Sequence, residues 1–249
     1  NVGLAFRDGD INAVPVMFGY NDDEGTLFFP DDREPFVWLE GFPKHDRALQ
    51  LAALKDVYTE QTAQTLLDLY PGISYSGTYD VVGADIMGDD IFGVNVRYAA
   101  RQSEKFGQPA YLYAFTRVPP SKNQTIGAFH AAELPFVFGT HEPILGVSGD
   151  DKAATELMQL FWTNFAKTGN PNSAQTEALA GQWKRHAGQH WFEITGNTDR
   201  VTGPLTDYNK ERLDALEVGL NHHLDKIDPT VNSAVKTQGS TVADGAGQP

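Results

Sequence analysis

The sequence predicts an α/β protein, built on a mostly parallel sheet with helices on its faces. Two apolar runs of strand length, at 14–20 and 110–116, alternate along the chain with longer helical stretches. The 249 residues are 41% hydrophobic and 11% aromatic, which is enough for the core of one large domain. The alternation of strands with helices favours this class over a helical bundle or a β-sandwich.

The first part of the chain predicts one strand and three helices. The apolar run at 14–20 is bounded by polar residues and predicts a buried strand, followed by a loop at 21–25. Two helices are expected within 46–69, where leucines cluster in the second. Another helix is expected at 85–105, with these apolar residues near one face: Ile86, Ile91, Val94 and Tyr98.

The second predicted strand, at 110–116, carries aromatic side chains at alternate positions. Because successive side chains of a strand point to opposite faces, Tyr111, Tyr113 and Phe115 are expected on one face of the sheet. A loop rich in proline, serine and asparagine follows at 118–125.

The remaining elements end in a polar tail. Residues 150–167 predict the longest helix, which Gly169 and Pro171 terminate. Its apolar stripe consists of Leu157, Leu160, Phe161 and Phe165. A short strand is expected near 191–194 and a last helix at 207–224. Residues 228–249 are small and polar, so a domain at 1–227 with a disordered tail is expected.

Composition excludes several classes of function. Lysine and arginine total 19 against 33 aspartates and glutamates, and the net charge of −14 disfavours nucleic-acid and anionic-membrane partners. The absence of cysteine excludes disulfides, thiolate metal sites and cysteine nucleophiles. Apolar runs are too short for a transmembrane segment, and residues 1–12 lack the pattern of a signal peptide.

Two ionisable residues follow the predicted strands. Glu24 comes after the strand at 14–20, and His130 comes after the strand at 110–116. Functional groups of open α/β sheets gather beyond the carboxyl ends of strands, so the two could be the orienting acid and the general base of a hydrolytic triad. Their order, acid before histidine, is that of α/β-hydrolases. The alternative is a surface glutamate in a turn and an unrelated loop histidine.

The sequence offers no nucleophile to complete such a triad. A nucleophile elbow requires Gly-x-Ser-x-Gly, and the run Gly-Val-Ser-Gly-Asp at 146–150 fails at its last position. Ser148 is interpreted instead as the cap of the helix at 150–167. No two glycines are adjacent, so a glycine-rich oxyanion loop is also missing. The chain alone is not expected to hold a complete hydrolase site.

Three long segments resemble one known family. VPVMFG with DEGT at 14–26, GAFHAAELPFVFG at 127–139 and FWTNFAKTGNPN at 161–172 are similar to hallmark segments of type-B carboxylesterases, the cholinesterase-like α/β-hydrolases. They occur in the family's order. The resemblance covers roughly 11–220 and only the C-terminal half of the family's domain, so it implies the C-terminal part of an α/β-hydrolase fold in residues 1–227.

The resemblance implies a role for each matching residue. Glu24 matches the triad acid and His130 the general base. Leu27 and Phe28 match positions that line the family's substrate gorge. Glu133 matches a buried acidic residue that supports the catalytic histidine.

Asp90 matches a family aspartate ahead of the helix that carries Arg97 and Arg101, and a structural role is expected for it. The resemblance implies a serine carboxylic-ester hydrolase that needs no cofactor and no metal. Its serine and oxyanion glycines would come from an N-terminal fragment, either a second polypeptide or a part missing from an incomplete product. A small-molecule ester is the expected substrate, and the family favours an extracellular location. The alternative is a non-catalytic, cholinesterase-like binding or adhesion module.

Three weaker motifs have ordinary structural alternatives. His186 and His190 have a spacing that binds zinc on a helix, but Gly188 lies between them and no acidic ligand is evident. Residues 8–12 imitate the start of a calcium loop and are interpreted as a turn. Asn123 begins a glycosylation sequon, which matters only in a secreted protein.

Overall fold

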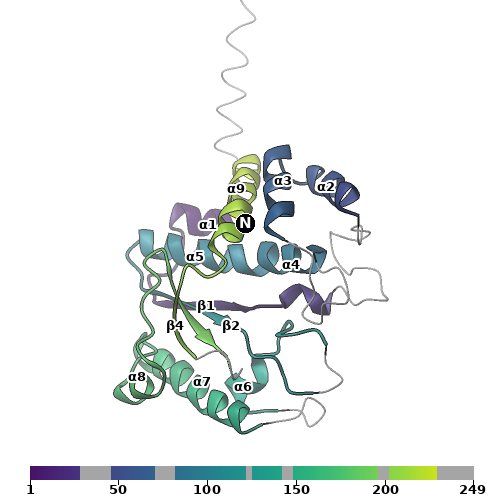
Figure 1. Ribbon diagram of the computed structural model, residues 1–249. Helices are drawn as coiled ribbons and strands as arrows, with labels where there is room; N and C mark the ends of the chain where they lie inside the picture. The colour runs from purple at the N-terminus through teal and green to yellow at the C-terminus, as the bar shows by residue number, and fades with distance from the viewer. Residues whose placement is uncertain (29–45, 71–81, 122–124, 142–147, 196–201, 229–249) are drawn as a thin grey trace, which may run out of the picture.

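The computed structural model contains a four-stranded mixed sheet between two layers of helices (Figure 1). The residues that it describes are 1–28, 46–70, 82–121, 125–141, 148–195 and 202–228. None of the helices in these ranges has the length and apolarity needed to cross a bilayer.

The strands lie side by side in the order in which they occur along the chain. They are β1 (Val16–Asn21), β2 (Ala110–Phe115), β3 (His190–Ile194) and β4 (Gly203–Thr206). The pairs β1–β2 and β2–β3 are parallel, and β3–β4 is antiparallel. The α/β class and three of the strands are confirmed. The fourth was not predicted, because four residues that include a proline carry no strand pattern.

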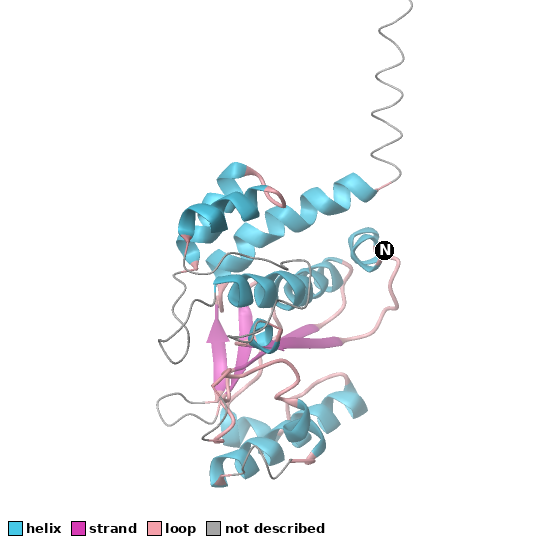
Figure 2. Ribbon diagram, turned by 90° about the vertical axis from the view of Figure 1, so that its right-hand side faces the viewer, coloured by secondary structure: helices cyan, strands magenta, loops and turns pink. Residues whose placement is uncertain are grey.

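Helices cover both faces of this sheet (Figures 1 and 2). One layer holds α1 (Val2–Asp8), α2 (Arg47–Lys55), α3 (Glu60–Leu69), α4 (Val82–Gly88), α5 (Val94–Lys105) and α9 (Lys210–Ile227). The other layer holds α6 (Leu134–Phe138), α7 (Gly149–Thr168) and α8 (Ala174–Ala180). The sequence did not predict α1, α6 and α8, because helices of five to seven residues are too short to display a helical period.

The helix predicted at 85–105 is instead three joined segments. Between α4 and α5 lies the π-helical segment η2 (Asp89–Gly93). Its first residue, Asp89, is buried and accepts hydrogen bonds from two tyrosines, Tyr20 at 3.0 Å and Tyr70 at 2.6 Å. π-Helical turns occur mostly as local interruptions of α-helices and often lie at functional sites.

The ends of the longer helices follow local chemistry. Ser148 caps α7 and forms a capping box with Asp151, which confirms the role predicted for this serine. Gly169 ends the helix in the left-handed conformation. The last helix begins at Lys210 rather than 207, because Asp207 and Asn209 adopt positive φ angles of 56° and 49° that a helix cannot contain.

Two apolar clusters form the core, one on each face of the sheet. Tyr20, Leu112 and Trp191 belong to the cluster beneath α3, α4, α5 and α9. The aromatic residues of β2 face the other cluster, as predicted: Tyr111, Tyr113 and Phe115. Trp183, Phe161 and Phe192 complete its centre.

The last residue that the structure describes, Asp228, is buried and forms an ion pair with Arg7 of α1. Residues 229–249 lie outside the described ranges, so the disorder expected for the tail stays a prediction.

Candidate functional site

Glu24 is held at the carboxyl end of β1 by a short 3-10 helix, η1 (Glu24–Leu27). This helix packs against α4 at a very close approach. A Cβ atom on Gly25 would lie 1.8 Å from the carbonyl oxygen of Ala84, so only glycine fits here. The close contact fixes η1 and buries the Glu24 side chain, of which 6% is exposed.

A short parallel bridge fastens the histidine loop beside Glu24. The bridge pairs Asp23 with Phe129. The Asp23 N–H donates to the Ala128 carbonyl at 3.1 Å, and the Ala128 N–H donates to the Asp23 carboxylate at 2.7 Å. Gly127 has a φ of 70°, and a Cβ atom there would lie 2.0 Å from Asp23 Oδ2. The loop that carries His130 is therefore hydrogen-bonded to Asp23, the residue directly before Glu24.

The two predicted residues meet directly. His130 Nδ1 lies 2.6 Å from Glu24 Oε2. The other carboxylate oxygen, Glu24 Oε1, accepts a hydrogen bond from the Asn21 N–H at 2.8 Å. The imidazole is 38% exposed, whereas its partner is buried. With Nδ1 held by Glu24, Nε2 is the nitrogen that can exchange a proton with a further group.

Burial raises the pKa of Glu24 above its ordinary value, while the Asn21 N–H and His130 act to lower it. The carboxylate of Glu133 adds to the rise through repulsion. The contact that holds Glu133 in the site is with Asn21. Its Oε2 accepts a hydrogen bond from the Asn21 side-chain amide at 2.7 Å, so it joins the site through Asn21.

Two aromatic rings lie close to the imidazole. The ring centroid of Phe28 lies 5.3 Å from that of His130, and the ring of Phe92 lies 4.9 Å away. Phe28 was predicted to line the substrate pocket and does adjoin His130, whereas Leu27 is 45% exposed at the end of η1. Phe92 could not be predicted, because a regular helix at 85–105 does not show how the π-helical segment orients this side chain.

Hydrogen bonds to Asp89 anchor the segment that carries Phe92. Tyr20 of β1 and Tyr70 after α3 both donate to its carboxylate, and the guanidinium of Arg212 lies 3.9 Å from it. The neighbouring Asp90 was expected to be structural, and its carbonyl accepts a hydrogen bond from the Asn95 side-chain amide at 2.8 Å.

One buried carboxyl and two half-buried ones predict that acidification stabilises the protein. Burial raises the pKa of Asp23, Asp89 and Asp90 to about 6. Each folded-state pKa lies above the unfolded value of about 3.9, so the stabilisation is complete below pH ~4 and is lost as the pH rises through about 6. We expect the free energy of unfolding to be higher at pH 5 than at pH 7 by at least about 1 kcal/mol.

Urea unfolding of the chain at the two pH values measures this difference. Burial lowers the pKa of His186, which by itself would make the protein more stable at higher pH. The three carboxyls together contribute more than this one histidine, so the net stability should still be higher at pH 5. Asp23→Asn should reduce the pH dependence, and Asp225→Asn, at an exposed aspartate, should not. Equal stability at both pH values would contradict the assignment of raised pKa values.

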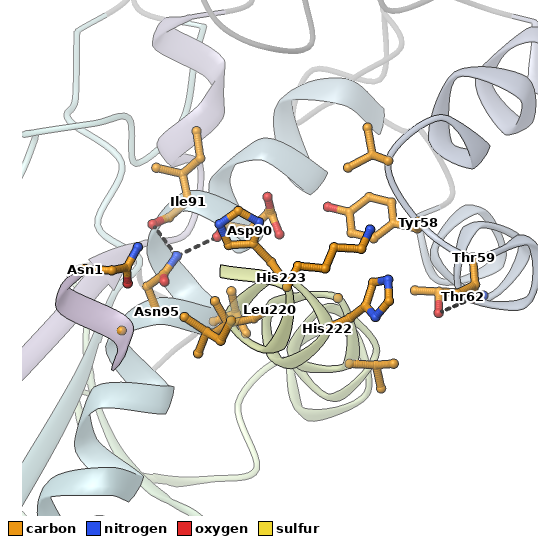
Figure 3. A pocket seen from close by; sticks show the side chains of 17 residues that line it. Asn1, Tyr58, Thr59, Thr62, Asp90, Ile91, Asn95, Leu220, His222 and His223 are labelled. Atoms are coloured by element: carbon orange, nitrogen blue, oxygen red, sulfur yellow. Dashed lines mark hydrogen bonds between the residues drawn. The ribbon is translucent and has the colours of Figure 1, made fainter. Parts of the chain in front are cut away.

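A cavity of about 610 Å³ lies away from the pair (Figure 3). It is open to solvent and is lined by the start of α1, by the segment that leads into α3, by η2 and α5, and by the second half of α9. Tyr58, Asp90, His222 and His223 are among its lining residues, and neither Glu24 nor His130 is.

The weaker motifs have structural explanations. His186 and His190 do not share a helix; His190 opens β3, and its carbonyl lies 3.0 Å from His186 Nδ1. Among the described residues, no group of three histidine or acidic side chains could hold a metal ion. Gly9 ends α1 in the left-handed conformation, which confirms the turn predicted at 8–12. Asn123 lies outside the described residues.

Residues 4–214 match the model of the carboxylesterase family. The chain belongs to the carboxylesterase family. It is 32% identical over 183 residues to the para-nitrobenzyl esterase of Bacillus subtilis (strain 168), covering 70% of this chain and 33% of that protein. It is 31% identical over 183 residues to the liver carboxylesterase of Sus scrofa, covering 66% of this chain and 30% of that protein.

Solved structures agree with this membership. A PNB esterase structure matches 86% of the chain and 40% of its own length, with a TM-score of 0.60 and 25% identity. A Geobacillus stearothermophilus carboxylesterase matches 86% of the chain and 42% of its own length, with a TM-score of 0.64; at 21% identity this shows the fold alone. The predicted family and α/β-hydrolase fold are confirmed. The chain spans about a third of the length of these two curated relatives.

Proposed function

We propose that this carboxylesterase-family chain is part of a serine carboxylic-ester hydrolase, in which it supplies the acid and the histidine of a Ser-His-Glu triad. The observation that supports this is the 2.6 Å contact between His130 Nδ1 and a buried carboxylate oxygen of Glu24. A buried carboxylate that binds one imidazole nitrogen, and an exposed imidazole edge, are what a hydrolytic base requires. The nucleophilic serine and the oxyanion donors belong to an N-terminal portion outside this chain.

The proposed reaction is a two-step acyl transfer to water. The serine attacks the ester carbonyl while His130 Nε2 accepts its proton, and His130 then gives this proton to the departing alcohol. Water attacks the acyl-enzyme in the second step, again with His130 as the base, and releases the acid. Glu24 keeps the imidazole in the tautomer with the proton on Nδ1 and stabilises the imidazolium that forms.

A small-molecule ester is the proposed substrate, in keeping with the para-nitrobenzyl esterase and liver carboxylesterase relatives. Phe28 and Phe92 place apolar surface next to His130. Aromatic side chains that surround a few polar groups are typical of sites for small organic ligands. Phe28 is proposed to contact the substrate. Leu27, which is 45% exposed at the end of η1, is proposed to line the same pocket.

The test is to combine the chain with the N-terminal portion of the domain, on one polypeptide or two, and to measure hydrolysis of p-nitrophenyl butyrate. We expect turnover by the combined protein, stoichiometric labelling of its N-terminal portion by a fluorophosphonate, and neither with the chain alone. Ser148→Ala is the matched control, because Ser148 caps α7 and should leave the rate unchanged. A folded combined protein without turnover or labelling would favour the adhesion-module alternative.

A further inference from the structure

Asn21 lies between the two carboxylates of the candidate site. It is the last residue of β1, and 1% of its surface is exposed. Its backbone N–H donates to Glu24 Oε1 at 2.8 Å. Its side-chain amide donates to Glu133 Oε2 at 2.7 Å and to the Phe129 carbonyl at 2.8 Å. One residue thus supplies three donors, to both carboxylates and to the residue before His130.

The chemistry of these partners determines the orientation of the Asn21 side-chain amide. A carboxylate and a carbonyl are both acceptors, so only the NH₂ side of Asn21 can face them. The Oδ1 atom is buried and has no hydrogen-bond partner among the described residues. Leaving a buried acceptor unsatisfied costs about 1–3 kcal/mol, which the two donated bonds must offset. An apolar side chain would avoid this cost but would leave Glu133 without its donor.

Hydrogen bonds from Asn21 also position the two acidic side chains that lie near His130, Glu24 and Glu133. The charge of Glu133 raises the pKa of Glu24 by repulsion, so the two side chains interact electrostatically. Hydrogen bonds from N–H groups to a carboxylate are charge-assisted and strong, so Asn21 holds both carboxyl groups in place. The other titratable side chains facing this region are Asp23, bonded to the Ala128 N–H, and Tyr113 of β2.

We infer that Asn21 is a positioning residue. It joins the acid-bearing strand to the histidine loop, and it controls the electrostatic potential at His130. It does not touch the reacting atoms. Its amide holds the loop through Phe129 and Glu133, while its backbone orients the Glu24 carboxylate. This role rests on the proposed function and adds a residue that the triad itself does not include.

The sharpest variant is Asn21→Asp, which keeps the size of the side chain, removes both side-chain donors and adds a negative charge. A nearby anion stabilises the imidazolium, so the pKa of His130, followed by NMR of its ring in this chain, should rise by about one unit. In the combined enzyme the acidic limb of kcat/KM should move to higher pH. We expect kcat to fall by about 10- to 100-fold with KM changed less than about twofold.

The double variant Asn21→Asp/Glu133→Gln reverses the direction of the hydrogen bond, because the new amide at 133 donates to the new carboxylate at 21. The double variant has the net charge of the wild type, so the pKa of His130 should return most of the way to its wild-type value and kcat should recover in part. A merely structural role for Asn21 predicts no such recovery. Asn170→Asp is the matched control, since this exposed asparagine accepts hydrogen bonds through Oδ1 and is remote from His130. Asn21→Ser keeps one donor and should show a smaller loss of kcat if Asn21→Asp does not fold.

A His130 pKa that is the same in Asn21→Asp and wild type, or no recovery in the double variant, would overturn the inference. If Asn21→Asp does not fold, unchanged kcat in Asn21→Ser would do the same. The NMR measurement needs no ester and no serine. If the pKa of His130 shifts as expected but the combined protein hydrolyses no ester, the positioning role of Asn21 stands and the proposed function is rejected.

Discussion

His130→Ala in the combined enzyme is expected to lower kcat for p-nitrophenyl butyrate by about 10⁴- to 10⁶-fold. The imidazole is the proposed base of both half-reactions, so its removal leaves the serine hydroxyl protonated and the leaving alcohol without a proton donor. KM should change far less, because aromatic and backbone contacts to the substrate remain. Steady-state kinetics measure the effect, with circular dichroism to establish folding.

The matched control for this substitution is His222→Ala. His222 is an exposed histidine on α9 that lines the separate cavity of about 610 Å³. It should leave kcat unchanged, which separates the loss of a base from the loss of any histidine. A folded His130→Ala enzyme that loses less than about tenfold in kcat would remove His130 from the proposed mechanism.

The second large effect is expected from Glu24→Gln. The change keeps the shape of the side chain but removes the charge, and its amide can present NH₂ to Nδ1 and favour the wrong tautomer. We expect kcat/KM near neutral pH to fall by about three to four orders of magnitude. Without the carboxylate the imidazolium loses stabilisation, so the pKa of His130 falls and the acidic limb of kcat/KM moves to lower pH.

A kcat/KM profile from pH 5 to 9 measures both consequences of Glu24→Gln. Glu177→Gln is the matched control, because Glu177 is an exposed glutamate on α8. It removes one negative charge from the same protein and should leave rate and profile unchanged. Superimposable profiles for Glu24→Gln and wild type would show that Glu24 is not the acid.

Parts of the site could be predicted because they depend on order along the chain. Parallel strands end at the same edge of a sheet, so residues that follow the strands at 14–20 and 110–116 had to lie near one another. That argument selected Glu24 and His130, which do meet at 2.6 Å. The side chains on one face of β2 were predictable for a similar reason, because strand alternation is strict.

Other parts could not be predicted, because they depend on contacts between distant segments. A regular period at 85–105 gives no sign of the π-helical segment, whose Asp89 is bonded to Tyr20 and Tyr70. The position of Phe92 against His130 follows from that segment. Asn21 looked like a loop residue, and its partners at 129 and 133 lie more than a hundred residues away.

The sequence by itself determined the α/β class, the family and the two residues that form the central pair. It did so because hydrophobic period, strand order and long motifs are properties of neighbouring residues along the chain. Only the tertiary structure decided that Gly25 lets η1 approach Ala84 closely, that Gly127 makes room for Asp23, and that Asn21 bridges two carboxylates. These depend on backbone separations of a few ångströms between segments distant in sequence, which packing of the whole domain sets.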